Sequence, residues 1–439
     1  MGKTVETLRY RWRDIAKSAH DVFIRTPEPD LPKRDVARMR AEIAACIEGR
    51  GGDVSSRARA AALGRAYLSL NPKGRRQFLE LVAEFVPNRE AIASCNHKLA
   101  AAENEAEYQE AARALRDALE SPPERLFRQF NSLPEGVKFL VDLRAELLTY
   151  RHADPALARI ETDLRYLLTS WFDIGFLELQ RITWNAPAAL LEKLANYEAV
   201  HEVRNWLDLK NRLDADRRCY AFFHPLMPTE PLIFIEVALT GGLSSAIEPL
   251  LDPKAPVEDP HEAQTAVFYS ISACQEGLSG ISFGNALIKR VANDLLQEFR
   301  SLRTVATLSP IPGFVAWLER RGGDEEPLMS MLSRRSWHRD PEVALALKEP
   351  LLRLCAHYLC EEKRDGGIAR DPVAHFHLSN GARMERINWL ADRSARALRE
   401  SAGMMVNYVY RIDQIDENHE AYCGQGEIAV SAPIKSLLH

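Results

Sequence analysis

The residues of this sequence that could do chemistry gather in three short segments, the first of which is a glycine-rich turn. Residues 277–285, Gly-Leu-Ser-Gly-Ile-Ser-Phe-Gly-Asn, follow an apolar run and precede an amphipathic stretch. Glycines let a backbone approach a ligand closely, and the N–H groups at a helix start suit an anion such as a pyrophosphate. The spacing matches neither the dinucleotide-binding fingerprint nor the P-loop, so a turn that only connects a strand to a helix is an equal alternative.

The second segment, residues 308–314, presents a serine hydroxyl at the end of an expected strand. Pro310 biases Ser309 toward an extended backbone and ends the strand there, so the hydroxyl is not spent inside a helix. No Gly-x-Ser-x-Gly elbow surrounds this serine. On these residues alone, a plain turn serine is the commoner case and a catalytic hydroxyl is the alternative.

The third segment, residues 372–382, carries His375 and His377. We expect it to be extended, which puts both histidines on one face and leaves a metal pair open. Because the sequence suggests no third ligand, one general acid–base histidine with a structural neighbour is the better functional interpretation. Most lone histidines are neither.

The sequence patterns of the elements that must position these residues differ between the two parts of the chain. Up to about Trp171 the apolar residues recur with helical spacing, and helices are expected over 57–70, around 78–82, and over 103–119 and 136–148. Beyond it, strands are expected over 219–223, 232–239, 266–272 and 304–308, with an amphipathic helix over 286–299. The order predicts an α+β protein with an all-α domain, residues 1–171, followed by a sheet-containing domain, residues 172–439.

Composition narrows the class of protein. The chain has 439 residues, 46% of them hydrophobic, which is enough for more than one core. Lys and Arg total 57 against 62 for Asp and Glu, so no general charge attracts nucleic acid. A mean hydropathy of -0.27 argues against a membrane span. Seven cysteines do not make a disulfide framework; Cys355 and Cys360 are expected to be buried, reduced thiols on a helix, which suits the cytoplasm.

Taken together, these segments make the sequence similar to one family over nearly its whole length. It resembles the malonyl-CoA decarboxylases. The segments that carry the resemblance, in chain order, are 217–220, 230–240, 268–272, 277–291, 308–314, 376–378, 380–382, 386–389 and 391–392. Many long motifs in the right order make the resemblance specific, and they give the three weak local signals a common explanation.

The resemblance implies a helical N-terminal domain that serves oligomerisation and a catalytic domain similar to the GCN5-related acyltransferase fold, in which a splayed mixed sheet admits the pantetheine arm. It implies that Ser309 and His377 are the catalytic pair and that the protein is a homo-oligomer, a dimer or a tetramer. The residues that it places at the coenzyme A thioester are Ser279, Gly280, Ile281, Ser282, Phe283, Gly284 and Asn285.

Two departures from the family pattern affect these expectations. The acyltransferase pyrophosphate motif usually opens with Gln/Arg, whereas the matching frame here begins at Gly277, which leaves open which amides hold the pyrophosphate. The chain ends Ser436-Leu437-Leu438-His439 rather than with the Ser-Lys-Leu tail of animal members, so we expect a bacterial-type cytoplasmic enzyme.

The implied substrate, malonyl-CoA, explains why no metal or organic redox cofactor is expected. Loss of carbon dioxide leaves an electron pair that the thioester carbonyl accepts, so the substrate is its own electron sink, and coenzyme A is part of it. We expect His377 to protonate the α-carbon and Ser309 to hydrogen-bond the carboxylate and orient His377, while N–H groups near residues 279–282 polarise the thioester. Tyr408 and Tyr410 could add a phenol, although such tyrosines are more often core residues.

Two other functions remain open on the sequence. One is an acyl-CoA-dependent N-acyltransferase, which needs a base for the attacking amine and an open acceptor channel, neither of which the sequence marks out. The other is a non-enzymatic acyl-CoA-binding regulator, which needs the glycine turn but neither Ser309 nor His377.

Overall fold

The chain forms two compact units, which we describe one at a time. The computed structural model describes residues 12, 13, 15, 27–49, 52–281, 286–322, 326–334, 336–364 and 366–439. The helical unit comprises the described residues up to Asp173 together with the short segments 225–228 and 275–281, and the sheet unit comprises the rest. The α+β class, with helices first and a mixed sheet second, is confirmed. The predicted division at residue 171 treats each domain as one continuous segment and stays a prediction.

The helical unit consists of helices whose starts the sequence encodes locally. Asn71 accepts a hydrogen bond from the backbone N–H of Gly74, and Asp154 accepts from Ala156 and Leu157, each cap being followed by proline at the first helical position. The four expected helices are confirmed. The helices are α2 (Lys33–Ile47), α3 (Asp53–Ser69), α4 (Pro72–Ala83), α5 (Arg89–Ala100), α6 (Glu105–Leu119), α7 (Pro122–Asn131), α8 (Gly136–Tyr150) and α9 (Pro155–Trp171).

Part of the glycine-rich turn packs against α8 inside the helical unit. The turn begins with the 3₁₀ helix η2 (Glu276–Leu278). The buried Arg144 donates from Nη1 to the carbonyl oxygen of Gly277 at 2.6 Å and forms an ion pair with Glu161 at 2.8 Å. A Cβ atom at position 277 would overlap the carbonyl oxygen of Val141, so only glycine allows this approach. Gly277 therefore has a structural role in packing this turn against α8, independent of any ligand that the rest of the turn binds.

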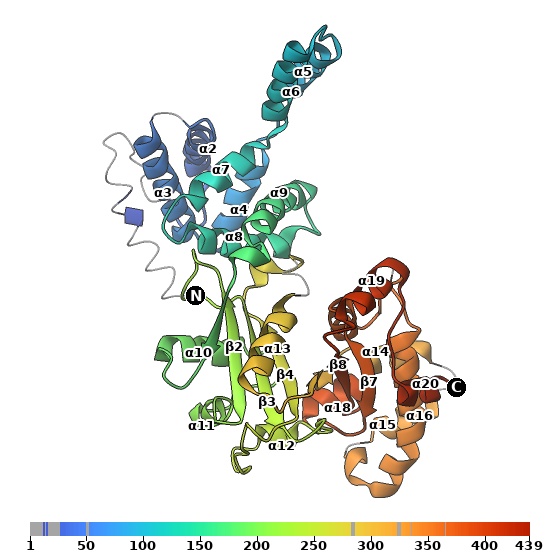
Figure 1. Ribbon diagram of the computed structural model, residues 1–439. Helices are drawn as coiled ribbons and strands as arrows, with labels where there is room; N and C mark the ends of the chain where they lie inside the picture. Colours follow the sequence, from blue (N-terminus) through green and yellow to red (C-terminus); the bar gives the residue numbers. More distant parts are fainter. Residues whose placement is uncertain are drawn as a thin grey trace. The chain divides into compact units, whose positions relative to one another are not determined.

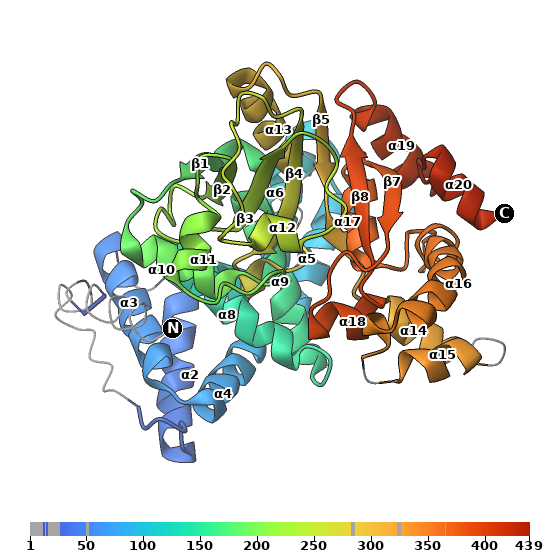
Figure 2. The same cartoon turned by 90° about the horizontal axis from the view of Figure 1, so that it is seen from below.

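The sheet unit is built on one eight-stranded mixed sheet with the order β1-β2-β3-β4-β5-β8-β6, in which β7 also pairs with β8 (Figures 1 and 2). Neighbours from β1 to β4 run antiparallel, β4 and β5 run parallel, and β8 runs antiparallel to β5, β6 and β7. The four expected strands are confirmed. The strands are β1 (Glu178–Ile182), β2 (Arg217–Phe223), β3 (Ile233–Thr240), β4 (Thr265–Ala273), β5 (Thr304–Thr307), β6 (Ser309–Pro310), β7 (Arg383–Asn388) and β8 (Met405–Tyr410).

The sheet opens where its parallel pair ends. β4 pairs with β5 only over residues 265–268, and the last bond of this ladder joins the N–H of Leu308 to the carbonyl of Phe268 at 3.0 Å. β4 then continues to Ala273, whereas the chain after Leu308 pairs Ser309 with Val406 of β8. The two parallel strands therefore part at Ser309, as the resemblance to a splayed sheet implied.

Helices surround this sheet, and one of them corrects a prediction. Residues 372–379, expected to be extended, form the helix α17. Asp371 caps it by accepting from the N–H groups of Val373 and Ala374, and Pro372 occupies its first position. The cap and the proline are local helix-start signals, so the expectation of an extended backbone here was wrong.

The remaining helices of the sheet unit complete the layer. In both views α16 and α20 lie near β7. Cys355 and Cys360 are buried on α16, as predicted. No helix among the described residues is long and apolar enough to cross a membrane. The helices are η1 (Ile174–Phe176), α10 (Ala188–Tyr197), α11 (Trp206–Asn211), α12 (Glu248–Leu251), α13 (Ala286–Glu298), α14 (Phe314–Arg321), α15 (Glu326–Leu332), η4 (Trp337–Arg339), α16 (Pro341–Cys360), α17 (Pro372–Ser379), α18 (Ala395–Ser401), α19 (Ile415–Gln425) and α20 (Ala432–Leu438).

Candidate active site

The sheet unit brings Ser309 and His377 into direct contact. The Oγ atom of Ser309, on β6, lies 2.9 Å from Nε2 of His377, on α17, although 68 positions separate them in the sequence. Only 5% of Ser309 and 3% of His377 are exposed. A hydroxyl and an imidazole are therefore held in a hydrogen bond that bulk water scarcely reaches, at the point where β4 and β5 part.

Two tyrosines of β8 hold the other sides of the imidazole ring. The hydroxyl of Tyr410 lies 2.8 Å from Nδ1 of His377, and the ring of Tyr408 stacks on the imidazole with 4.6 Å between centroids. Ser309 donates its hydroxyl proton to Oγ1 of Thr307 at 2.8 Å, so it accepts from Nε2–H of His377. This network assigns the tautomer: Nε2 carries the proton, and Nδ1 accepts from Tyr410.

The helix that carries His377 is fixed at both ends. At its start, the buried Asp371 also accepts from the hydroxyl of Tyr358 at 3.4 Å. At its end, the backbone carbonyl of His377 accepts from the N–H groups of Asn380 and Ala382. Gly381 permits this turn, because its φ is +79° and a Cβ there would overlap the carbonyl oxygen of Ile415. The imidazole consequently sits in the last turn of α17, where the helix dipole favours a positive charge.

A buried amide that the sequence analysis missed braces the strand before Ser309. Asn407 of β8 is completely buried and donates to the carbonyl oxygens of Thr307 at 2.8 Å and Ser244 at 3.1 Å. Its own carbonyl accepts from Asn388 at 2.8 Å and from Arg386 at 3.2 Å. One asparagine inside the otherwise apolar and aromatic run of β8 is the signal that could have revealed it, because a buried amide needs partners.

Burial sets the protonation state of this cluster. Desolvation lowers the pKa of His377 to about 3, and it raises the pKa values of the Tyr408 and Tyr410 phenols well above their ordinary range. The imidazole is therefore neutral and both phenols are protonated near pH 7. A carboxylate that approached the ring would favour the charged imidazolium and raise the pKa of His377 again.

The second histidine of the segment does not join this cluster. On α17, His375 and His377 point to different sides, and Nδ1 of His375 lies 2.9 Å from the hydroxyl of Tyr422. The prediction that both share one face was wrong, because it assumed an extended backbone. In the part of the chain that the structure describes, no group of three or more His, Cys, Asp or Glu side chains could hold a metal ion.

The predicted coenzyme A segment lies partly within the described residues. Ser279, Gly280 and Ile281 belong to the helical unit, whereas Ser282, Phe283, Gly284 and Asn285 lie outside the described residues. The N–H groups of Ser279 and Ile281 donate within the turn, to the carbonyls of Glu276 and Leu278. Gly280 has a φ of +73°, which favours glycine. The role of this segment at coenzyme A stays a prediction.

Fold and site together define an α+β protein in which a buried hydroxyl and a buried imidazole form a hydrogen bond at the opening of a mixed sheet. The profile of the malonyl-CoA decarboxylase C-terminal domain matches residues 175–439, and that of the N-terminal domain matches residues 85–172. The chain belongs to the malonyl-CoA decarboxylase family.

Similar proteins of known identity agree with this assignment. Mitochondrial malonyl-CoA decarboxylase from Rattus norvegicus is 41% identical over 357 residues, which cover 74% of this chain and 72% of the rat protein. The crystal structure of malonyl-CoA decarboxylase from Rhodopseudomonas palustris is 40% identical and covers 91% of this chain and 99% of its own, with a TM-score of 0.86. The Agrobacterium vitis enzyme is 39% identical, covers 92% and 100%, and has the same TM-score.

The lowered pKa of His377 predicts how stability responds to acid. The unfolded chain binds a proton at this residue below about pH 6.5, whereas the folded protein resists it until about pH 3. The contribution of His377 to the free energy of unfolding is therefore fully present above about pH 6.5. It decreases as the pH falls below that value, by up to about 1.4 kcal/mol per pH unit. Urea unfolding between pH 7 and 5 measures the slope, which His377→Gln should reduce. The exposed control His152→Gln should keep the wild-type slope, and an unchanged slope in His377→Gln would contradict the assignment.

Proposed function

We propose that this protein converts malonyl-CoA to acetyl-CoA and carbon dioxide. The observation that carries the proposal is the buried hydrogen-bonded chain Ser309–His377–Tyr410 at the opening of the sheet, in a protein of this family. In the reaction the bond between the α-carbon and the carboxylate breaks, and its electron pair moves into the thioester as an enolate. One proton then adds to the α-carbon. No metal or redox cofactor is required for this balance, because the thioester of the substrate itself accepts the electron pair.

We assign the proton donor to His377, charged by the substrate itself. A neutral imidazole is a poor acid, but the malonyl carboxylate would favour the imidazolium when it lies beside the ring. The C-terminal end of α17 and the stacked ring of Tyr408 favour the same positive charge. Tyr410 can then accept from Nδ1–H. In this proposal His377 is neutral in the empty site, and it becomes the charged imidazolium, a stronger acid, when the malonyl carboxylate binds.

Ser309 has the complementary role of binding the malonyl carboxylate and orienting His377. Its hydroxyl is held between Nε2 of His377 and Oγ1 of Thr307, so it can turn toward a substrate oxygen without losing its bond to the imidazole. Decarboxylation requires the carboxylate to be rotated out of the thioester plane, and a hydrogen-bond donor in a fixed position can hold it in that orientation. Desolvation of the carboxylate in this buried site adds to the same effect.

The thioester carbonyl needs donors of its own, which we assign to backbone N–H groups near residues 279–282. Coenzyme A would bind along residues 279–285, an assignment that rests on the family resemblance. One oxyanion donor typically lowers a barrier by about 3 kcal/mol. In the conformation described, Ser279 and Ile281 use their N–H groups within the turn, so binding requires a rearrangement there or donors from their neighbours.

The defining experiment mixes the purified protein with malonyl-CoA alone. We expect acetyl-CoA and carbon dioxide in equal amounts, measured by chromatography and by a coupled bicarbonate assay. If product formed only when an amine was added, the N-acyltransferase alternative would hold. Binding without turnover would leave the acyl-CoA-binding regulator.

Single variants test the two roles. His377→Ala and Ser309→Ala should each lower kcat by two orders of magnitude or more, the scale of a general acid or an oxyanion donor. His375→Ala is the matched control, since it lies on the same helix but contacts Tyr422, and it should stay within a few-fold of the unaltered protein. Near-normal turnover in either active-site variant removes that residue from the mechanism.

Proton uptake on binding tests the charging of His377. The 2-carboxyethyl thioether of coenzyme A keeps the carboxylate but has no thioester carbonyl, so it cannot lose carbon dioxide. Calorimetric titrations at pH 7 in buffers of different ionisation enthalpy should show uptake approaching one proton per site. The ethyl thioether, which has no carboxylate, and the variant His377→Gln should show none. Binding of the carboxyethyl compound with no uptake would exclude a substrate-charged imidazolium.

We infer that the protein assembles as a homo-oligomer, a dimer or a tetramer, through the α5–α6 hairpin. Both helices are described in full, and Ala111 is their one buried residue. Tyr108 and Leu119 are 48% and 54% exposed, and the hairpin stands apart from the other helices of its unit (Figure 1). Tyr108→Glu with Leu119→Glu should lower the mass measured by light scattering, and the surface control Glu110→Gln should not. An unchanged mass would place the interface elsewhere.

We also infer that the protein works in a bacterial cytoplasm. All seven cysteines are free, and five of them are buried with pKa values raised by burial: Cys46, Cys219, Cys274, Cys355 and Cys360. Inert, reduced thiols suit a reducing compartment.

A further inference from the structure

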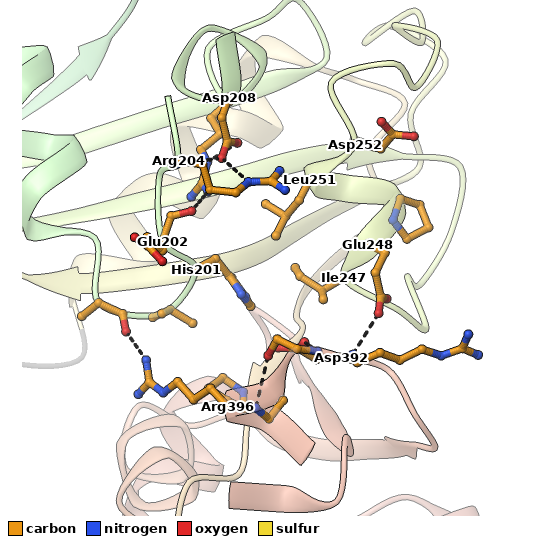
Figure 3. Close-up of a pocket in the computed structure, with 18 of the residues that line it drawn as sticks. His201, Glu202, Arg204, Asp208, Ile247, Glu248, Leu251, Asp252, Asp392 and Arg396 are labelled. Carbon is orange, nitrogen blue, oxygen red and sulfur yellow. Dashed lines mark hydrogen bonds and ion pairs between the residues drawn. The ribbon is translucent and has the colours of Figure 1, made fainter. Parts of the chain in front are cut away.

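A cavity of about 1350 Å³ in the sheet unit has no part in the proposed reaction. Its walls come from the segment before and into α11, from α12 with the loop after it, and from α18 with the segment before it (Figure 3). Val373 of α17 also lines it. Pro310, Ile311 and Pro312 also line it, but Ser309 and His377, both of which the structure describes, do not. The cavity therefore adjoins the reactive serine along the chain and is lined by other side chains.

His201 is the residue that marks this cavity as a binding site. It is 8% exposed, and its Nε2 atom has no hydrogen-bond partner among the described residues. Figure 3 shows the ring directed into the cavity, toward Asp392. The backbone N–H of His201 donates to Glu198 at 2.7 Å, which fixes the segment that carries it. A buried polar atom without a partner costs about 1–3 kcal/mol, so a ligand that satisfied it would gain that interaction.

Asp392 faces His201 across the cavity and is also largely buried, at 9% exposure. Its backbone N–H donates to the carbonyl of Gly403 at 3.1 Å, and its Oδ1 accepts from the N–H of Ser394 at 2.8 Å. The carboxylate is thus held in place by backbone bonds. It lies in the segment 391–392, which carries the family resemblance but has no role in the chemistry assigned to Ser309 and His377.

Charges around His201 favour a cationic ligand. Burial lowers the pKa of its imidazole, whereas Asp392 and Glu198 act in the opposite direction as the strongest nearby charges. The neutral ring can offer Nε2 as an acceptor. The lining also holds five basic residues: Arg204, Arg212, Lys254, Arg393 and Arg396. Arg204 and Arg212 both pair with Asp208, and Arg396 bonds to Glu400 and to the carbonyl of Ala199. Two acceptors, one of them negative, therefore face the same space.

We propose that this cavity binds a small amphipathic primary amine, with its ammonium group between His201 Nε2 and Asp392. A primary ammonium has three donors and one positive charge, which matches a neutral imidazole and a carboxylate. The apolar side chains of the lining would contact the body of the amine. They include Ile247, Leu251, Pro310, Ile311 and Pro312.

Calorimetry with three probes of one length tests the charge. n-Hexylammonium should bind with a measurable Kd, whereas n-hexanol and hexanoate should bind at least tenfold more weakly. His201→Phe and Asp392→Asn should each weaken hexylammonium binding at least tenfold, and the exposed control His152→Phe should leave it unchanged. Asparagine at 392 keeps the side-chain acceptor for Ser394, so this variant remains informative if His201→Phe fails to fold. Equal or tighter binding of hexanoate would overturn the proposal.

A second measurement uses the unaltered protein. Crystals soaked with 4-bromobenzylamine should show the anomalous signal of bromine inside the cavity, with the amine nitrogen within hydrogen-bond distance of His201 and Asp392. A signal only elsewhere, or none, would overturn the proposal. Binding of hexylammonium should also persist at saturating coenzyme A. If coenzyme A displaced it, the cavity would belong to the substrate site and not to a separate amine, whether or not the protein decarboxylates malonyl-CoA.

Discussion

The hydrogen bond between Ser309 and His377 is the constraint that the surrounding strands and helix of the sheet unit must satisfy. It requires a strand that stops at Ser309, a helix that ends just beyond His377, and a neighbouring strand that supplies Tyr408 and Tyr410. A separate structural feature meets each condition. Pro310 follows the serine and ends the strand, and a cap with a proline starts α17. The antiparallel pairing of β8 places the two tyrosines. Burial then makes the cluster neutral, so its charge state becomes something that a bound anion can change.

The opening of the sheet and the position of the serine have a single cause. Parallel pairing of β4 and β5 ends at Phe268 and Thr307, and the next residues of the chain pair with β8 instead. Asn407 keeps this exchange of partners in place, because its amide bonds to the carbonyl of Thr307 from inside β8. A sheet that parted without such a brace would leave backbone groups buried and unpaired, at a cost of about 1–3 kcal/mol for each. The brace thus explains how an opening can exist inside a well-packed core.

Much of the fold could be predicted from the sequence, and the family resemblance named Ser309 and His377 as a pair, which the structure places in contact. Helical spacing located α3, α4, α6 and α8 of the first unit, and apolar runs located β2 to β5, because these signals are local. The strand β1 was missed, since Glu178–Ile182 is a charged edge strand whose residues are mostly exposed. α17 was mistaken for an extended segment, although Asp371-Pro372 is a helix start that the sequence itself displays. Thr307 and Asn407 meet His377 or its neighbours only through the pairing of distant strands, which no spacing along the chain encodes. Tyr408 and Tyr410, which the sequence offered as phenols with core residues as the commoner alternative, reach His377 through the same strand, β8.

The two buried histidines of the sheet unit show why partners, more than burial, determine what an imidazole can do. Desolvation lowers the pKa of both His377 and His201. His377 has a hydroxyl at each nitrogen, so a proton can arrive at the ring and leave it along existing bonds. His201 has an open Nε2 and a carboxylate across a cavity, so it can accept from a ligand but has no chain of donors behind it. The same type of side chain therefore suits proton transfer at the opening of the sheet and recognition of a donor group in the cavity.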